Sequence, residues 1–200
     1  MQIGIVIVAA GRGERAGIED GPKQYRRIGG RAVIAHTLEV FLTWYRAASV
    51  VAVIHPEDRD LLVQAIAGLP GADRVTIAIG GATRQQSVLS GLEAIVPTEA
   101  THVMIHDAAR PFIDHALLER IAARLDGGDE AVLPALPVFD TLKRSTGGTV
   151  EGTVSREGLF AAQTPQTFRL PAILQAHRDA EGAGFNAFTA DCSIAEWAGI

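Results

Sequence analysis

The chain has 200 residues, of which 48% are hydrophobic and 20% are charged, and its formal net charge is −5 at pH 7. This length and composition suit one folded unit with a sizeable core, and they argue against intrinsic disorder. The acidic balance excludes a general nucleic-acid binder, which would carry a basic surface. We therefore expect no nucleic-acid partner, and we expect any bound anion to meet its cations in one local group.

The single cysteine, Cys192, excludes an internal disulfide and a multi-cysteine metal site. The first apolar run, Ile3–Val8, is short and has no basic leader, so it predicts a strand and not a signal peptide. No apolar stretch approaches the length of a membrane span. We therefore expect a cytoplasmic protein with no membrane partner.

Short β-branched runs alternate with helical stretches along the first two thirds of the chain. The apolar runs are continuous, which indicates strands buried on both faces. Their alternation with helices predicts an α/β fold with a doubly wound, mostly parallel, Rossmann-like sheet. In chain order, we expect strands over residues 3–8, 50–54, 75–79, 103–105 and 131–136, and helices near 32–46, 57–68, 84–95 and 114–125.

Residues 138–160 interrupt this alternation. Two strand-like pieces, 138–144 and 150–156, flank the segment 145–149, whose paired glycines suit a hairpin turn. Neither piece alternates regularly enough to bury one face in the main core. We therefore expect a projecting β-hairpin arm that a partner subunit covers. A solvent-exposed edge hairpin is the alternative.

The loop after the first strand carries Gly11, Gly13, Arg12, Arg15 and Lys23. Glycines let backbone N–H groups approach an anion closely, and the cations supply opposing charge. Ligands bind outside the carboxyl ends of strands in open α/β sheets. The loop therefore predicts polyphosphate binding, with Arg12, Arg15 and Lys23 as the local group of cations.

A dinucleotide-binding fingerprint competes with this interpretation, because residues 11–16 fit G-x-G-x-x-G/A. That fingerprint requires a helix to begin inside the motif, yet Gly17, Gly21 and Pro22 all oppose one. The second strand also ends at His55, where an acidic residue is expected. A nicotinamide site is therefore disfavoured, and a glycine-rich turn with incidental charges remains the structural alternative.

Two further loops follow strand ends and are expected at the same edge of the sheet. Gly80-Gly81 frees the backbone to contact a flat ligand, and Ser87 falls in the first turn of the next helix. Asp107 suits a magnesium or sugar-hydroxyl role, with an N-cap or a structural pair with Arg110 as the alternative. His106 does not pair with Asp107, because neighbours on a strand point to opposite faces.

Four motifs in the chain are more selective together than any one alone. They are Ala9-Ala10-Gly11-x-Gly13-x-Arg15, Pro22-Lys23-Gln24-Tyr25, His106-Asp107-Ala108-Ala109-Arg110-Pro111 and Asp140-Thr141-Leu142-Lys143. The first would fit many sugar nucleotidyltransferases, whereas the last two are much more specific. In combination the chain resembles the 2-C-methyl-D-erythritol 4-phosphate cytidylyltransferase family from Ile3 to its last residue.

The resemblance implies cytidylyl transfer from CTP to methylerythritol phosphate, with release of pyrophosphate, in isoprenoid precursor synthesis. It also implies a magnesium ion and a homodimer in which each arm reaches the neighbouring active site. By motif position, it implies catalytic roles for Arg15, Lys23 and Arg156, CTP binding by Ala9, Ala10, Gly11, Gly13, Gly81 and Ser87, and substrate binding by Asp107, Arg110, Thr141 and Arg156. Asp107 is also the candidate metal ligand.

The chain departs from the family pattern at two acidic positions. Ala190 stands where the family usually has the first acid of Thr-Asp-Asp or Thr-Asp-Glu, so Asp191 is the residue that would compensate. Ala82 stands where many relatives carry an acid beside the base.

The chain also stops at Ile200, where the family normally continues through another strand. We therefore expect one nucleotidyltransferase domain over residues 1–200 without its last strand, as the N-terminal part of a fusion with a cyclodiphosphate synthase. The alternatives are a ribitol-5-phosphate or sugar-1-phosphate nucleotidyltransferase, and a catalytically silent nucleotide-binding module.

Overall fold

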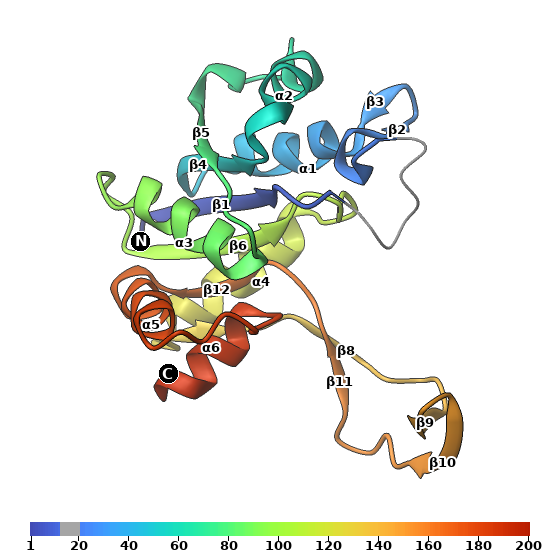
Figure 1. Cartoon of the computed structure of the whole chain (residues 1–200). Helices are drawn as coiled ribbons and strands as arrows, with labels where there is room; N and C mark the ends of the chain where they lie inside the picture. Colours follow the sequence, from blue (N-terminus) through green and yellow to red (C-terminus); the bar gives the residue numbers. More distant parts are fainter. Residues whose placement is uncertain (13–20) are drawn as a thin grey trace.

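The computed structural model describes residues 1–12 and 21–200. These residues form a six-stranded central sheet in the order β5–β4–β1–β6–β12–β7 (Figure 1). The first four strands in that order are parallel, whereas β12 runs antiparallel to both of its neighbours. The predicted mostly parallel sheet is therefore confirmed. The strands are β1 (Ile3–Ala9), β4 (Ala47–Ile54), β5 (Val75–Ile79), β6 (His102–Asp107), β7 (Ala131–Val132) and β12 (Gln166–Arg169).

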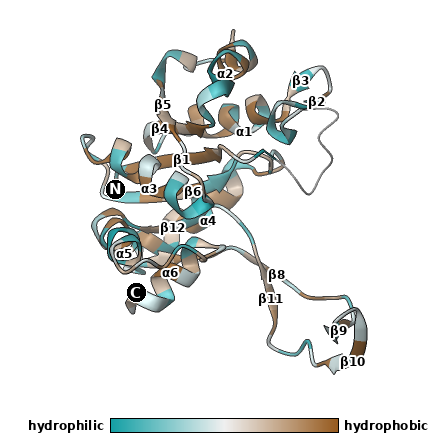
Figure 2. Cartoon of the chain, in the orientation of Figure 1, coloured by the Kyte–Doolittle hydropathy of each residue, from teal (hydrophilic) through white to brown (hydrophobic). Residues whose placement is uncertain are grey.

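Helices cover both faces of this sheet. Ile5 and Ile7 belong to one buried cluster and Val6 to another, so successive residues of β1 face opposite layers. Figure 2 shows the resulting hydrophobic centre. Strands buried on both faces explain the continuous apolar runs of the sequence. One face carries α1 (Val33–Leu42), α2 (Arg59–Ile66) and α4 (His115–Asp126), and the other carries α3 (Arg84–Ile95), α5 (Leu170–Gly182) and α6 (Asp191–Ala198).

The strand order reverses beside β1. The chain moves outward from β1 to β4 and β5, and then returns to place β6 on the other side of β1. The helices that follow β1 and β6 along the chain, α1 and α4, contribute to the same buried cluster. Such a reversal is where open α/β sheets bind ligands.

An arm projects from the sheet at the residues predicted for it (Figure 1). Its stem pairs β8 (Ala135–Pro137) with β11 (Phe160–Ala162), and its outer hairpin pairs β9 (Leu142–Thr146) with β10 (Thr149–Val154). Gly147 and Gly148 connect the outer strands with φ of +56° and +84°, values that favour glycine in a tight hairpin turn.

The structure corrects two predicted boundaries. The strand expected over 131–136 is wrong as one element, because β7 pairs in the central sheet and β8 in the arm. Pro134 lies between them and has no backbone N–H to continue the ladder. The helix expected near 32–46 ends earlier, where the Thr43 hydroxyl donates to the Glu39 carbonyl at 2.7 Å.

Several short elements complete the described chain. They are the small hairpin β2 (Arg27–Ile28) and β3 (Arg31–Ala32), and the 3-10 helices η2 (Lys23–Tyr25), η3 (Pro56–Asp58) and η4 (Ala72–Arg74). Among the helices of the described residues, none combines the length and the hydropathy that crossing a bilayer requires.

Candidate functional site

Of the three loops predicted to converge, the second and third meet the described start of the first at the carboxyl edge of the sheet. The β6 loop joins the β1 end through a 3.0 Å hydrogen bond from the Ala108 N–H to the Val8 carbonyl. The β5 loop approaches so closely at Gly80 that an added Cβ would lie 2.4 Å from Ala10 Cβ and 2.8 Å from Ser87 Oγ. Glycine at residue 80 is therefore required to bring the first two loops together.

Lys23 is positioned by the residue that follows it. Gln24 is buried, and its amide Nε2 donates to the Ala9 carbonyl at 2.6 Å and to the Gly11 carbonyl at 3.1 Å. These bonds attach η2 to the end of β1, while the Lys23 side chain stays exposed. Lys23 therefore projects from a fixed base at the edge where the sequence predicted a phosphate site.

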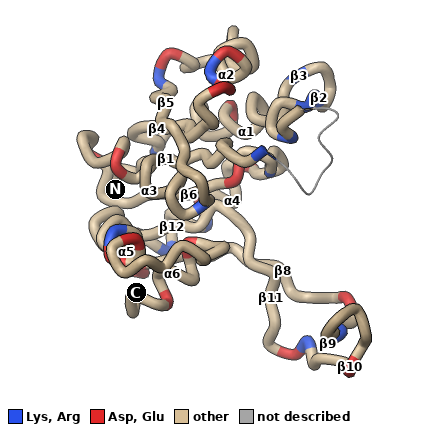
Figure 3. The backbone as a smooth tube through the Cα atoms, in the orientation of Figure 1, with Lys and Arg blue, Asp and Glu red and all other residues tan. Residues whose placement is uncertain are grey.

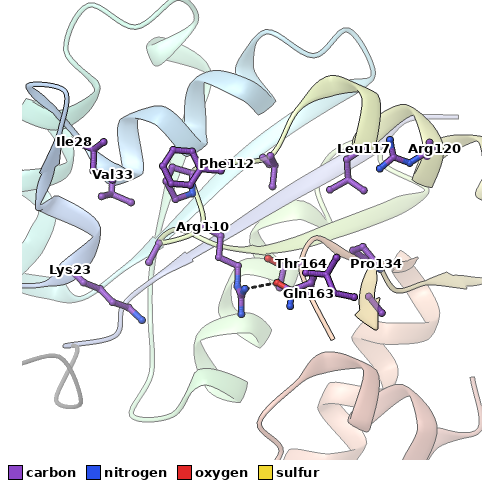
Figure 4. A pocket seen from close by; sticks show the side chains of 15 residues that line it. Lys23, Ile28, Val33, Arg110, Phe112, Leu117, Arg120, Pro134, Gln163 and Thr164 are labelled. Atoms are coloured by element: carbon purple, nitrogen blue, oxygen red, sulfur yellow. Dashed lines mark hydrogen bonds between the residues drawn. The ribbon is translucent and has the colours of Figure 1, made fainter. Parts of the chain in front are cut away.

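A pocket of about 680 Å³ lies beside Lys23 (Figure 4). Arg110 and Gln163 supply polar groups to its lining, and Arg110 Nη1 donates to Gln163 Oε1 at 2.6 Å. The rest of the lining is mainly apolar and comes from Ile28, Val33, the 111–113 loop, α4 and the start of the arm. The pocket thus connects the sheet edge with the base of the arm.

Asp107 lies between two guanidinium groups. Its Oδ2 accepts from Arg110 Nε at 3.1 Å, and its Oδ1 lies 3.5 Å from Arg84 Nη2. Arg84 begins α3, so this contact joins the second loop to the third. The structural pair between Asp107 and Arg110, which the sequence left open, is therefore present, and Asp107 is not an N-cap.

The first turn of α3 is fixed by a capping box. Thr83 Oγ1 accepts from the Gln86 N–H at 3.1 Å, and Gln86 Oε1 accepts from the Thr83 N–H at 3.3 Å. Ser87 is buried and its hydroxyl donates to the Thr83 carbonyl at 2.9 Å, whereas Gly81 is exposed. Of the two residues predicted here for CTP, Gly81 is the one open to solvent.

His106 faces away from Asp107, as predicted for neighbours on a strand. Its Nδ1 lies 2.8 Å from Thr164 Oγ1 and its Nε2 lies 3.0 Å from the Arg110 carbonyl. Burial lowers the pKa of His106 to about 4, because the charged ring loses its hydration. His106 therefore has a structural position, and it holds the loop that carries Arg110.

Arg12, predicted as one of the phosphate-binding cations, pairs within its own chain in the described structure. Its Nη1 lies 2.9 Å from Asp58 Oδ1, and its Nη2 contacts Glu57 and His55. Two carboxylates of η3 therefore neutralise Arg12. Asp58 lies 46 residues away from Arg12 along the chain, so the local sequence carried no sign of this ion pair. Gly13 and Arg15, the other predicted residues of this loop, lie outside the described residues.

Thr141 and Arg156 are exposed on the arm. Arg156 Nη1 donates to the Phe139 carbonyl within the arm itself. Figures 1 and 3 show the arm extending away from the sheet, so the described chain does not bring these residues to Lys23 or Asp107.

A metal at this edge would depend on Asp107. Among the described residues, no three His, Cys, Asp or Glu side chains gather to hold an ion. Asp107 is 33% exposed, and a single accessible carboxylate fits the usual Mg²⁺ arrangement, in which phosphate oxygens complete the shell. Asp191 does not fit, because its side chain is completely buried against Arg84 and His177.

Arg84 and Gln24 also belong to this edge, although no sequence motif predicted a role for them. The Thr83-x-x-Gln86 capping pattern predicts a helix start, and it places Arg84 in the first turn beside the paired glycines. That signal would have found Arg84. The double attachment of Gln24 depends on the path of the backbone and has no sequence signal.

Comparisons with known proteins agree with this geometry. The sequence profile of the family described as IspD, 2-C-methyl-D-erythritol 4-phosphate cytidylyltransferase, matches residues 3–200. The chain is 59% identical over 199 residues to a bifunctional enzyme IspD/IspF of Rhizobium leguminosarum, covering 98% of this chain and 49% of that protein. It is 60% identical over 201 residues to one of Agrobacterium fabrum, covering 100% and 50%. The chain thus spans about half the length of these curated relatives.

Solved structures resemble the whole described fold. The 2-C-methyl-D-erythritol 4-phosphate cytidylyltransferase of Thermus thermophilus superposes with a TM-score of 0.78 at 33% identity, covering 100% of this chain and 85% of that one. The enzyme of that name from Francisella tularensis superposes with a TM-score of 0.82 at 26% identity, covering 100% and 88%.

Proposed function

Because the chain belongs to the 2-C-methyl-D-erythritol 4-phosphate cytidylyltransferase family, we propose that it transfers a cytidylyl group from CTP to methylerythritol phosphate. The observation that carries the proposal is the meeting of Lys23, the Gly80-Gly81 loop and Asp107 at one sheet edge. These groups suit a nucleoside triphosphate, because glycine loops approach phosphates and a lysine offsets their charge. The reaction belongs to isoprenoid precursor synthesis.

The transfer needs little covalent chemistry from the protein. A phosphate oxygen of methylerythritol phosphate attacks the α-phosphorus of CTP. The bond from that phosphorus to the bridging oxygen breaks, and pyrophosphate leaves with the electron pair. The attacking phosphate has a second pKa of about 6, so it is largely ionised at pH 7 without a general base.

Catalysis then consists of positioning and charge stabilisation. Lys23 and Arg15 stabilise the negative charge that develops on the triphosphate. The segment Ala9–Gly13 and Gly81 contact CTP, and the buried Ser87 supports the Gly81 loop. Asp107 and Arg110 bind substrate at the same edge. Asp107 is the residue that would hold Mg²⁺, which neutralises triphosphate charge when it is bound.

We propose that two copies of the chain complete the site by exchanging arms. The arm buries little apolar surface within its own chain, and exposed apolar groups of this extent favour a protein partner. Thr141 and Arg156 would then reach the partner's substrate, since arginine binds phosphate with two parallel hydrogen bonds. The supporting side chains are Leu136 (58% exposed), Phe139 (76%), Val150 (61%) and Phe160 (62%) on the arm, and Phe112 (88%) at the pocket. We expect the dimer to work in the cytoplasm.

Pyrophosphate release tests the proposal. The full chain should release pyrophosphate with CTP and methylerythritol phosphate in the presence of Mg²⁺. It should release much less with ribitol 5-phosphate or a sugar 1-phosphate, and much less when ATP replaces CTP. A preference for ribitol 5-phosphate would assign the alternative acceptor, and CTP binding without turnover of any acceptor would indicate a silent module.

A further inference from the structure

A series of ionisable side chains leads from the partly exposed edge of the site into the buried interior. Arg84 Nη2 lies 3.5 Å from Asp107 Oδ1 and 2.8 Å from Asp191 Oδ2. The same nitrogen therefore faces two carboxylates, one on the edge and one in the core. The shorter distance shows that Asp191 is the closer partner of Arg84.

Asp191 cannot meet a ligand itself. It is the first residue of α6, and its exposed fraction is 0%. Burial raises the pKa of Asp191, but its contacts with His177 and Arg84 lower that pKa by more than burial raises it. The net pKa therefore lies below its ordinary value. Asp191 is thus an interior carboxyl group whose contacts favour its charged form, and its effect on the site passes through Arg84.

His177 lies at the interior end of this series of ionisable side chains. It lies on α5, is also 0% exposed, and its Nε2 is 3.3 Å from Asp191 Oδ1. Neither ring nitrogen makes an aligned hydrogen bond among the described residues. The contact with Asp191 is therefore the interaction that accounts for a histidine at this interior position, because a buried polar group needs a compensating partner.

We propose that His177 is a positioning residue of the nucleotide site. Its Nε2 lies 3.3 Å from one oxygen of Asp191, and this contact favours the orientation in which the other oxygen faces Arg84. Arg84, which would otherwise have several rotamers, is thereby fixed beside Asp107. This inference rests on the proposed function, since that function gives Asp107 its role in binding.

A set of variants of the full chain tests this role through CTP affinity. The probe is CTP itself, measured by titration calorimetry, together with turnover where it occurs. His177→Leu should weaken CTP binding about tenfold, and His177→Gln, which keeps a polar group beside Asp191, should restore most of it. Leu174→Ala on the same helix is the matched control. It removes buried apolar contacts and should lower the unfolding temperature, yet leave CTP affinity within about twofold.

A double-mutant cycle with Arg84→Met separates positioning from packing. If His177 acts through Arg84, His177→Leu should cause no further loss in the Arg84→Met background. Equal losses in both backgrounds, or an unchanged affinity in His177→Leu, would overturn the inference. His177→Met fills similar space without a donor and serves in the cycle if His177→Leu does not fold.

CTP binding does not require an acceptor, so the two proposals fail separately. A wild-type chain that binds CTP but does not use methylerythritol phosphate overturns the proposed acceptor only. A wild-type chain that does not bind CTP overturns both proposals.

Discussion

The side-chain amide of Gln24 donates a 2.6 Å hydrogen bond to the backbone carbonyl of Ala9. A second bond from the same nitrogen reaches the Gly11 carbonyl at 3.1 Å. Gln24 is 2% exposed, so its side-chain amide is shielded from water. The short helix that carries Lys23 is consequently anchored to the end of the first strand, and the lysine stands at a constant place on the sheet edge.

Lys23→Ala should reduce turnover by about 10²–10³ at saturating CTP, because it removes a preorganised charge that acts on the transition state. The fold should be nearly unaffected, since the side chain is exposed. Steady-state pyrophosphate release and thermal unfolding measure the two effects. Arg27→Ala, at another exposed cation near the same segment, should leave both unchanged. Near-normal turnover in Lys23→Ala would remove the assignment.

Gly80→Ala should weaken CTP binding and lower the free energy of unfolding by about 1–3 kcal/mol, as expected for overpacking. The new Cβ would lie 2.4 Å from Ala10 Cβ, so the two loops must separate. Calorimetric titration and urea unfolding provide the measurements. Gly182→Ala is the control, because nothing lies within 4 Å of its added Cβ and alanine suits a helix. If both variants bind CTP and unfold like wild type, the close approach at Gly80 is not needed for CTP binding or for stability.

Mixing Lys23→Ala with Arg156→Ala should restore activity if the arms are exchanged. A mixed dimer then contains one site with neither lesion and one with both. With equal mixing and free exchange, half of the dimers are mixed, so about a quarter of wild-type activity should return by two-fold symmetry. Subunit exchange must be shown independently, for example by tagged chains. Exchange without recovery would mean that Arg156 serves its own subunit or has no role in the site.

Acid should destabilise the fold through His106. Its folded pKa of about 4 lies below the unfolded value of 6.5, so the unfolded chain binds a proton first as the pH falls. The stability contribution is therefore complete above pH 6.5 and is lost progressively between pH 6.5 and pH 4. Between pH 7 and pH 5 the loss from this group should be about 2 kcal/mol.

Urea unfolding of wild type and His106→Gln in metal-free buffer measures this loss. The variant lacks the titrating ring, so its unfolding free energy should depend less on pH over the same interval. An identical pH dependence for the two proteins would show that another group controls acid stability.

Much of the fold was readable from the sequence because its signals are local. The strands β1, β4, β5 and β6 correspond to mainly apolar runs of the sequence. Each predicted helix follows its strand at the expected spacing. The arm was predicted from Gly147-Gly148 and the lack of regular alternation around them. The split of 131–136 was not predicted, because two adjacent strands joined through Pro134 look like one apolar run.

The site was readable in part for the same reason. Motif residues such as Lys23 and Asp107 lie at strand ends, and the parallel sheet brings those ends to one edge. Ion pairs between side chains on distant segments left no signal in the local sequence. Arg12 forms an ion pair with Asp58, and Arg84 contacts both Asp107 and Asp191.

The sequence by itself determined the alternating elements, the glycine loops and the family to which the chain belongs. Each of these depends on residue type and spacing along the chain. Only the tertiary structure decided which charges remain free at the sheet edge. That choice depends on which buried carboxylates lie opposite each guanidinium, since a buried charge must be paired and its partner comes from whichever element packs against it.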